Sequence, residues 1–234
     1  MKIGILAAGT TPDDLSAEYP SYAQMFVNLF SSINEEFEYE FFDVRNDIFP
    51  ASEQVADAWL ITGSKHGVYE NLPWMVRLKD LIVAINKAGK PLVGICFGHQ
   101  IIAEAMGGKV EKFSGGWGLS LQTYKLLNSD DMTPDREFTI NAIHQDQVVE
   151  KPAGADVIAT SDFCQYAGLK YGDKIITFQA HPEFTVDFER SLLNVRKGTV
   201  LPDADADAGL NKLGNGATTD SKKVAGWLAE FIRR

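Results

Sequence analysis

The stretch from Pro91 to Gly98 reads Pro-Leu-Val-Gly-Ile-Cys-Phe-Gly, and it decides the fold of this 234-residue chain. Its apolar run up to Ile95 predicts a buried strand, and the pattern from Gly98 to about Met106 predicts a helix directly after it. Glycine two positions before and two positions after Cys96 gives the Gly-x-nucleophile-x-Gly pattern of a nucleophile elbow. In such an elbow a sharp, strained turn exposes the nucleophile, and the two glycines let the strand and the helix pass closely. We therefore expect an α/β protein with a functional residue at position 96.

Strands and helices alternate outward from the elbow. Apolar runs at 3–6, 39–44 and 58–62 predict strands, and apolar spacings of three and four at 21–33 and 73–89 predict helices. This alternation favours right-handed strand–helix–strand units and a parallel sheet. Short runs separated by turn residues follow Gly108, at 119–127, 137–143, 157–160, 165–170 and 174–178, and they indicate antiparallel or mixed pairing. The expected fold is an open, mostly parallel twisted sheet with helices on both faces and a small antiparallel edge.

The C-terminal part is expected to belong to the same unit, a single domain over residues 1–234. The segment 201–219 is rich in Asp, Ala, Gly and Asn and predicts an acidic surface loop. It is not an EF-hand loop, because the sixth and twelfth positions counted from Asp203 hold Ala208 and Gly214 instead of Gly and Glu. A helix over about 221–233 has one apolar face, which we expect to dock on the core.

Cys96 is the candidate nucleophile. The N-terminus of the helix that follows favours the thiolate, and the turn directs the backbone N–H of Phe97 to the position where an oxyanion would form. The alternative is a buried, inert cysteine, which is the commoner state of a single cysteine.

A second motif, His181-Pro182-Glu183, favours catalysis. It follows an apolar run, and the residue before a proline is biased toward extended geometry. Residues two apart in an extended segment point to the same side. Glu183 can then orient His181 while the other imidazole nitrogen faces Cys96, which is the logic of a catalytic triad.

These motifs resemble those of the class I, or triad, glutamine amidotransferases. The resemblance is carried by 94–100, by 179–183 and by Thr62-Gly63-Ser64, and it extends from the first strand to about Phe184. It is strong for stand-alone members that are similar to the amidotransferase domain of GMP synthase. The resemblance implies a flavodoxin-like open sheet. It also implies hydrolysis of a γ-glutamyl amide, glutamine to glutamate plus ammonia, through a γ-glutamyl thioester.

The resemblance also implies a role for each matching residue. Cys96 would attack, His181 would shuttle the proton and Glu183 would hold His181. The backbone N–H groups of Gly63 and Phe97 would form the oxyanion hole. Coupled family members usually have leucine at the second of these positions, but the N–H is the same. The substrate-binding residues implied by the pattern are Gln100, Trp117 and His144.

Composition excludes several other functions. The chain has 32 acidic and 22 basic residues, a net charge of −10, which argues against general nucleic-acid binding. We find no apolar run of the roughly 20 residues that a membrane span needs. The two cysteines suit a reducing cytosol, so we expect a cytoplasmic protein. The His and Cys spacings do not match a metal site, and no phosphate-binding loop is present, so we expect neither metal nor cofactor.

Three functions stay open at this stage. The protein could hydrolyse glutamine, a γ-glutamyl peptide or another γ-glutamyl compound alone, or it could be a glutaminase subunit that feeds a separate synthase. The segment after Glu183 is too short for a synthetase domain. The third function is a non-catalytic relative, and the intact Cys96, His181 and Glu183 argue against it. An α/β-hydrolase is disfavoured because its acid precedes its histidine along the chain.

Overall fold

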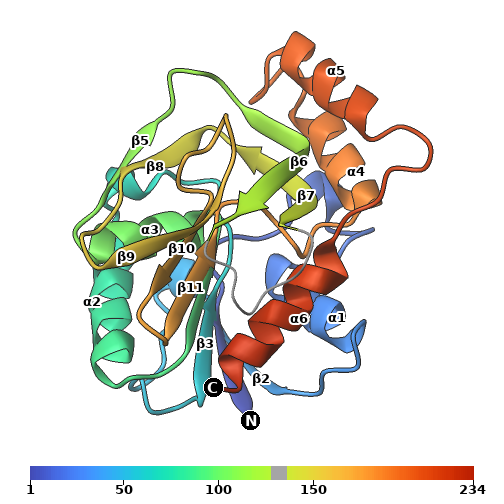
Figure 1. The fold of residues 1–234 in the computed structure, drawn as a ribbon. Helices are drawn as coiled ribbons and strands as arrows, with labels where there is room; N and C mark the ends of the chain where they lie inside the picture. Colours follow the sequence, from blue (N-terminus) through green and yellow to red (C-terminus); the bar gives the residue numbers. More distant parts are fainter. Residues whose placement is uncertain (128–135) are drawn as a thin grey trace.

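A nine-stranded sheet forms the centre of the molecule in the computed structural model, which describes residues 1–127 and 136–234. Within these residues the strand order is β2-β1-β3-β4-β11-β10-β9-β6-β7. The first five strands in this order run parallel, and the remaining neighbours pair antiparallel (Figure 1).

The parallel strands are Lys2–Leu6 (β1), Glu38–Phe42 (β2), Ala58–Ile61 (β3), Leu92–Ile95 (β4) and Ile175–Phe178 (β11). All except β2, the edge strand, are almost entirely buried and apolar, as parallel strands covered on both faces must be. Ile61 pairs with Gly94, and Ile95 pairs with Phe178. The loops that follow β3, β4 and β11 therefore meet at one edge of the sheet, where ligands bind in open α/β folds.

The antiparallel strands are Gly118–Leu126 (β6), Glu137–His144 (β7), Ala155–Thr160 (β9) and Gly168–Tyr171 (β10). Together they form the antiparallel edge expected from the short runs after Gly108, so the predicted fold class is confirmed. A separate antiparallel pair, Lys109–Lys112 (β5) with Asp146–Glu150 (β8), has no counterpart in the sequence prediction.

Helices cover both faces of the sheet (Figure 1). Pro73–Lys87 (α2) and Phe97–Ala105 (α3) pack on one face, and Tyr22–Ser31 (α1) and Ser221–Ile232 (α6) pack on the other. All four were expected from the sequence, α1, α2 and α6 from their apolar spacing and α3 from its place after the elbow. Short 3-10 turns lie at Asp13–Leu15, Val44–Asn46 and Val68–Glu70.

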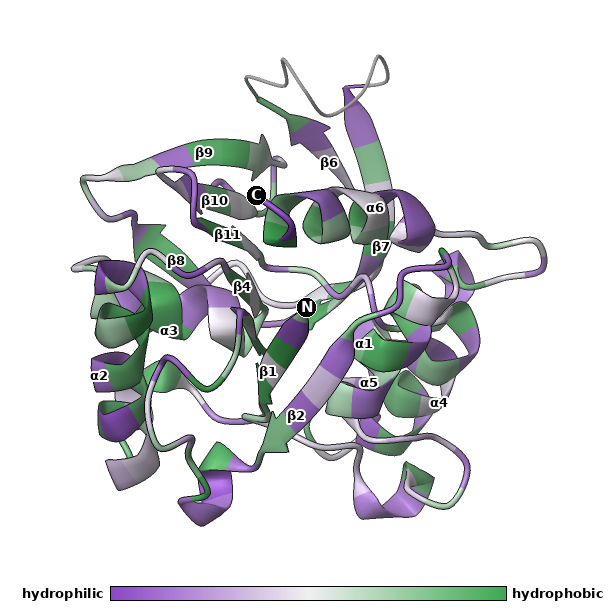
Figure 2. Ribbon diagram, turned by 90° about the horizontal axis from the view of Figure 1, so that it is seen from below, coloured by the Kyte–Doolittle hydropathy of each residue, from purple (hydrophilic) through white to green (hydrophobic). Residues whose placement is uncertain are grey.

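Two further helices, Val186–Arg196 (α4) and Asp203–Lys212 (α5), lie beside α1 and across the central strands from α2 and α3 (Figure 2). The prediction of an acidic loop over 201–219 is wrong for α5. Asp203 and Asp205 lie in its first turn, where negative charge stabilises the helix N-terminus. Its buried side consists of small residues: a Cβ on Gly209 would lie 3.1 Å from the Leu193 side chain. Such a face gives a weak apolar pattern in the sequence.

None of the helices in residues 1–127 and 136–234 is long and apolar enough to cross a membrane.

Candidate active site

The site lies at the edge of the sheet where the parallel strands end. The Ala8 N–H after β1 donates to the Thr62 hydroxyl after β3 (3.0 Å), and the Cys96 N–H after β4 donates to the Phe178 carbonyl of β11 (2.9 Å). The first bond uses the Thr62 side chain, and the second uses backbone groups alone. The second bond holds Cys96 next to the end of β11, three residues before His181.

Cys96 occupies a strained turn. Its φ and ψ are 54° and −104°, in a region that costs a non-glycine residue about 1–3 kcal/mol. The turn requires glycine at positions 94 and 98, because the neighbouring atoms leave no space there for a side chain. A Cβ on Gly94 would lie 2.7 Å from the Gly98 carbonyl oxygen, and a Cβ on Gly98 would lie 2.4 Å from the Ile61 carbonyl oxygen. The strand–turn–helix context predicted for the elbow is therefore present.

His181 and Glu183 form a buried pair beside Cys96. His181 Nδ1 lies 2.7 Å from Glu183 Oε1, and both side chains are at most 3% exposed. The Phe184 ring stacks on the imidazole, with a centroid distance of 4.0 Å and an angle of 3° between the planes. His181 Nε2 is buried and makes no hydrogen bond of ordinary geometry with a described residue. It is therefore the nitrogen that is left to exchange a proton with Cys96.

The electrostatics of this pair favour a charged imidazole. Burial lowers the pKa of His181, but the charges of Glu183 and Cys96 outweigh it and hold that pKa well above its ordinary value. An imidazolium held by a carboxylate can donate its proton to a leaving amine and still be held in place.

Gly63 lies against both reactive side chains. A Cβ at this position would be 2.8 Å from His181 Cε1 and 3.7 Å from Cys96 Cβ, so a larger residue would displace the imidazole. Neither the Gly63 N–H nor the Phe97 N–H donates a hydrogen bond to another described residue. Both groups are thus free to donate to an oxygen bound beside Cys96.

Strand β7 holds the histidine loop in place, which the sequence did not indicate. The His181 N–H donates to the Asn141 carbonyl (2.8 Å), and the Asn141 side-chain amide donates to the Phe184 carbonyl (2.9 Å). Asn141 is completely buried. A lone asparagine in a strand carries no recognisable signal, and its partner in the isolated bridge is a residue 40 positions later.

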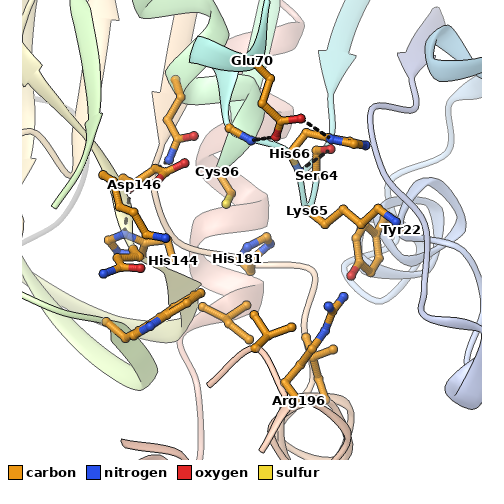
Figure 3. Close-up of a pocket in the computed structure, with 18 of the residues that line it drawn as sticks. Tyr22, Ser64, Lys65, His66, Glu70, Cys96, His144, Asp146, His181 and Arg196 are labelled. Carbon is orange, nitrogen blue, oxygen red and sulfur yellow. Dashed lines mark hydrogen bonds and ion pairs between the residues drawn. The ribbon is translucent and has the colours of Figure 1, made fainter. Parts of the chain in front are cut away.

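A cavity of about 680 Å³ opens at Cys96 and His181. The three residues expected to bind substrate, Gln100, Trp117 and His144, all line it. Figure 3 shows Cys96 and His181 in the middle of the cavity, with His144 and Asp146 on one side. We call this side, with Gln100 and Trp117, the amide side of the pocket.

The amide side is held by its own hydrogen bonds. Gln100 Nε2 donates to the Asp146 carbonyl (2.9 Å) and to Gln179 Oε1 (3.1 Å), which leaves the Gln100 oxygen to meet a ligand. His144 Nδ1 lies 3.2 Å from the same Asp146 carbonyl. Burial lowers the pKa of His144 to about 4, so this imidazole is neutral at pH 7.

The opposite side of the cavity carries residues that the sequence did not single out for the site. Tyr22 from α1, Lys65 from the loop after β3 and Arg196 from the last turn of α4 face the cavity there (Figure 3). Tyr22 also contacts Phe184, the ring stacked on His181, with centroids 5.2 Å apart. We call this side the cationic side of the pocket. No group of three or more His, Cys, Asp or Glu residues able to hold a metal occurs within the residues described.

Comparisons with known proteins agree with this geometry. Residues 20–194 match the model of the glutamine amidotransferase class-I family. The chain is 31% identical to gamma-glutamyl peptidase 4 of Arabidopsis thaliana over 76% of this chain and 74% of the relative. It is 34% identical to a glutamine-hydrolyzing GMP synthase subunit of Archaeoglobus fulgidus over 53% of this chain and 72% of the relative. The crystal structure of a glutamine amidotransferase from Thermotoga maritima superposes with a TM-score of 0.76 at 19% identity, covering 99% of this chain and 97% of the other.

Proposed function

Because this chain belongs to the class-I glutamine amidotransferase family and is an enzyme, we propose that it hydrolyses γ-glutamyl amide bonds through a thioester on Cys96. The observation that carries the proposal is the strained Cys96 elbow beside the 2.7 Å His181–Glu183 pair. The substrate is glutamine or a γ-glutamyl peptide, and the products are glutamate and the released amine.

In the first half-reaction the Cys96 thiolate attacks the γ-carbonyl carbon. The N–H groups of Gly63 and Phe97 donate to the oxyanion that forms. His181 Nε2 gives its proton to the amine, the C–N bond breaks, and the γ-glutamyl group stays on sulfur. Glu183 holds the imidazole by Nδ1 throughout, so that Nε2 keeps its position.

In the second half-reaction water replaces the amine. His181 Nε2 takes a proton from water as the hydroxide attacks the thioester carbon. The C–S bond breaks, glutamate leaves, and the thiolate–imidazolium pair is restored. Hydrolysis therefore consumes one water per bond and needs no cofactor. The Gln100 oxygen, Trp117 and neutral His144 would hold the glutamyl group on the amide side.

The test is glutamate release from L-glutamine and from γ-glutamylglycine by the wild type, Cys96→Ala and Cys164→Ala. Cys164 is the other buried cysteine, and it does not line the cavity. We expect release by the wild type and Cys164→Ala, and none by Cys96→Ala with its thermal midpoint nearly unchanged. Full activity of Cys96→Ala would reject the proposal.

A second candidate is a glutaminase subunit that passes ammonia to a separate synthase. The similarity to the GMP synthase subunit of Archaeoglobus fulgidus supports it. It predicts that glutamine is hydrolysed slowly by the isolated protein and that γ-glutamylglycine is not hydrolysed at all.

A further inference from the structure

Arg196 is a half-buried cation that has no partner among the described residues. Its side chain forms no ion pair or hydrogen bond with any described residue, although it lines the cavity that contains Cys96. Two other basic residues on or next to α4 are paired. Arg190 binds Asp187 (2.7 Å) and the Leu213 carbonyl (2.8 Å), and Lys197 binds Asp207 (2.5 Å). A guanidinium partly removed from water gains from an anion, and none of the described residues supplies one here.

Arg196 also lies within reach of the reaction. Burial raises the pKa of Tyr22 and the charge of Arg196 lowers it, and both residues line the cavity that contains Cys96. Figure 3 shows the Arg196 side chain directed toward Tyr22, with Cys96 and His181 separating this group from His144 and Asp146. A substrate that spans the cavity would place its glutamyl part on the amide side and its amine part on the cationic side.

No acidic group among the described residues forms an ion pair with Arg196. Glu70 lines the cavity and lies five positions after Lys65 in the chain. Both of its carboxylate oxygens already have hydrogen-bond partners. Oε1 accepts from the Gly67 N–H (2.8 Å), and Oε2 lies 3.0 Å from His66 Nδ1. The exposed Lys65 makes no hydrogen bond or ion pair with a described residue and adds a second positive charge on this side.

We infer that the cationic side is a carboxylate-binding subsite for the leaving group, with Arg196 as its specificity-determining residue. The preferred substrates are then γ-glutamyl peptides whose amine part carries a free carboxylate, rather than glutamine. The planar guanidinium matches a carboxylate with two parallel hydrogen bonds, which a lysine cannot do. Leu192, Val200 and Pro202 line the same end of the cavity and give apolar surface to the residue that bears the carboxylate. The inference rests on the proposed function.

The test compares γ-glutamylglycine with its C-terminal amide, which has nearly the same shape but no negative charge. The proteins are the wild type, Arg196→Met, Arg196→Lys and the control Lys197→Met, which removes one positive charge from the adjacent, paired residue. The wild type and Lys197→Met should favour the acid by about tenfold or more in kcat/KM. Arg196→Met should lose this preference by losing activity on the acid alone, and Arg196→Lys should keep part of it.

A binding measurement separates this inference from the proposed function. Calorimetry with Cys96→Ala should show tighter binding of γ-glutamylglycine than of its amide, and Cys96→Ala combined with Arg196→Met should show no difference. Equal kcat/KM values for acid and amide in the wild type would overturn the inference while the γ-glutamyl hydrolase stands. So would an unchanged preference in Arg196→Met. Absence of turnover together with absence of binding would instead reject both the subsite and the proposed function.

Discussion

The two walls of the cavity are built in different ways. On the wall formed by β4 and α3, backbone groups fix the geometry: the Cys96 turn, the glycines at 94 and 98, and the free N–H groups of Gly63 and Phe97. On the wall formed by α4, side chains define the surface, and Arg196 has no partner among the residues that the structure describes. The first wall tolerates almost no change without moving a reactive atom. The second can change its side chains and leave the chemistry intact, so this arrangement separates reactivity from leaving-group specificity.

The largest effect is expected for Glu183→Gln. The substituted amide can still bind Nδ1, but it stabilises neither the imidazolium nor the correct tautomer, so kcat should fall by about 10³–10⁴-fold. Because the charge of Glu183 raises the pKa of His181, the alkaline limit of activity should also move to lower pH. A pH series of kcat on γ-glutamylglycine measures both changes.

Glu189→Gln is the matched control for this substitution. Glu189 is also completely buried and lies six positions later on α4, but it does not line the cavity. Its substitution should change kcat only a few-fold. Equal losses in the two variants would mean that any buried carboxyl group near His181 matters, and not the hydrogen bond to Nδ1.

The next largest effect is expected for Gly98→Ala. The added Cβ would lie 2.4 Å from the Ile61 carbonyl oxygen, so β3 and α3 must separate. The free energy of unfolding should fall by about 3 kcal/mol, and kcat should fall with it as the elbow shifts. Urea denaturation and activity assays measure the two effects.

Gly226→Ala gives the comparison on α6, where the position is exposed and a Cβ would meet nothing within 4 Å. It should raise the free energy of unfolding by about 1 kcal/mol with no change in activity. If both glycine substitutions were equally tolerated, the close packing around the elbow would not constrain the nucleophile.

A further effect, on stability, concerns Glu189 on α4 and depends on pH. Burial raises the pKa of Glu189 from 4.5 to about 8, although the Ser120 N–H donates to its Oε1 (3.3 Å). Between these two values the folded protein binds the proton and the unfolded chain does not, so the stability of the wild type falls as pH rises. The slope approaches about 1.4 kcal/mol per pH unit.

Glu189→Gln removes this titration. Relative to the wild type, the variant should therefore gain stability steadily from about pH 5 to pH 8 and no further above it. Urea denaturation at several pH values tests this. Parallel curves for the two proteins over the whole range would show that Glu189 is ionised in the folded state.

The sequence predicted the wall formed by β4 and α3 because the constraints on that wall are local. A strand, a glycine pair around Cys96 and a helix follow one another within a dozen residues, and His181 and Glu183 are two positions apart. Each of these relations can be recognised along the chain. Their mutual placement then follows from the parallel order of β3, β4 and β11.

The sequence did not predict the α4 wall because its constraints are long-range. Nothing in the sequence near Arg196 distinguishes it from the paired Arg190; only the fold shows that no acidic group among the described residues reaches it. Asn141 supports His181 from a distant strand. Likewise α5 packs through Ala206 and Gly209, and residues this small give no helical apolar pattern in the sequence.

The most direct test of the account is a search for the acyl-enzyme during turnover of γ-glutamyl p-nitroanilide, whose good leaving group makes acylation faster than deacylation. The reaction is quenched with acid, and the intact mass and peptide masses are measured. We predict one γ-glutamyl group attached to Cys96, removable by hydroxylamine and absent in Cys96→Ala. Release of p-nitroaniline with the γ-glutamyl group on another residue, or with no covalent adduct at all, would contradict the account.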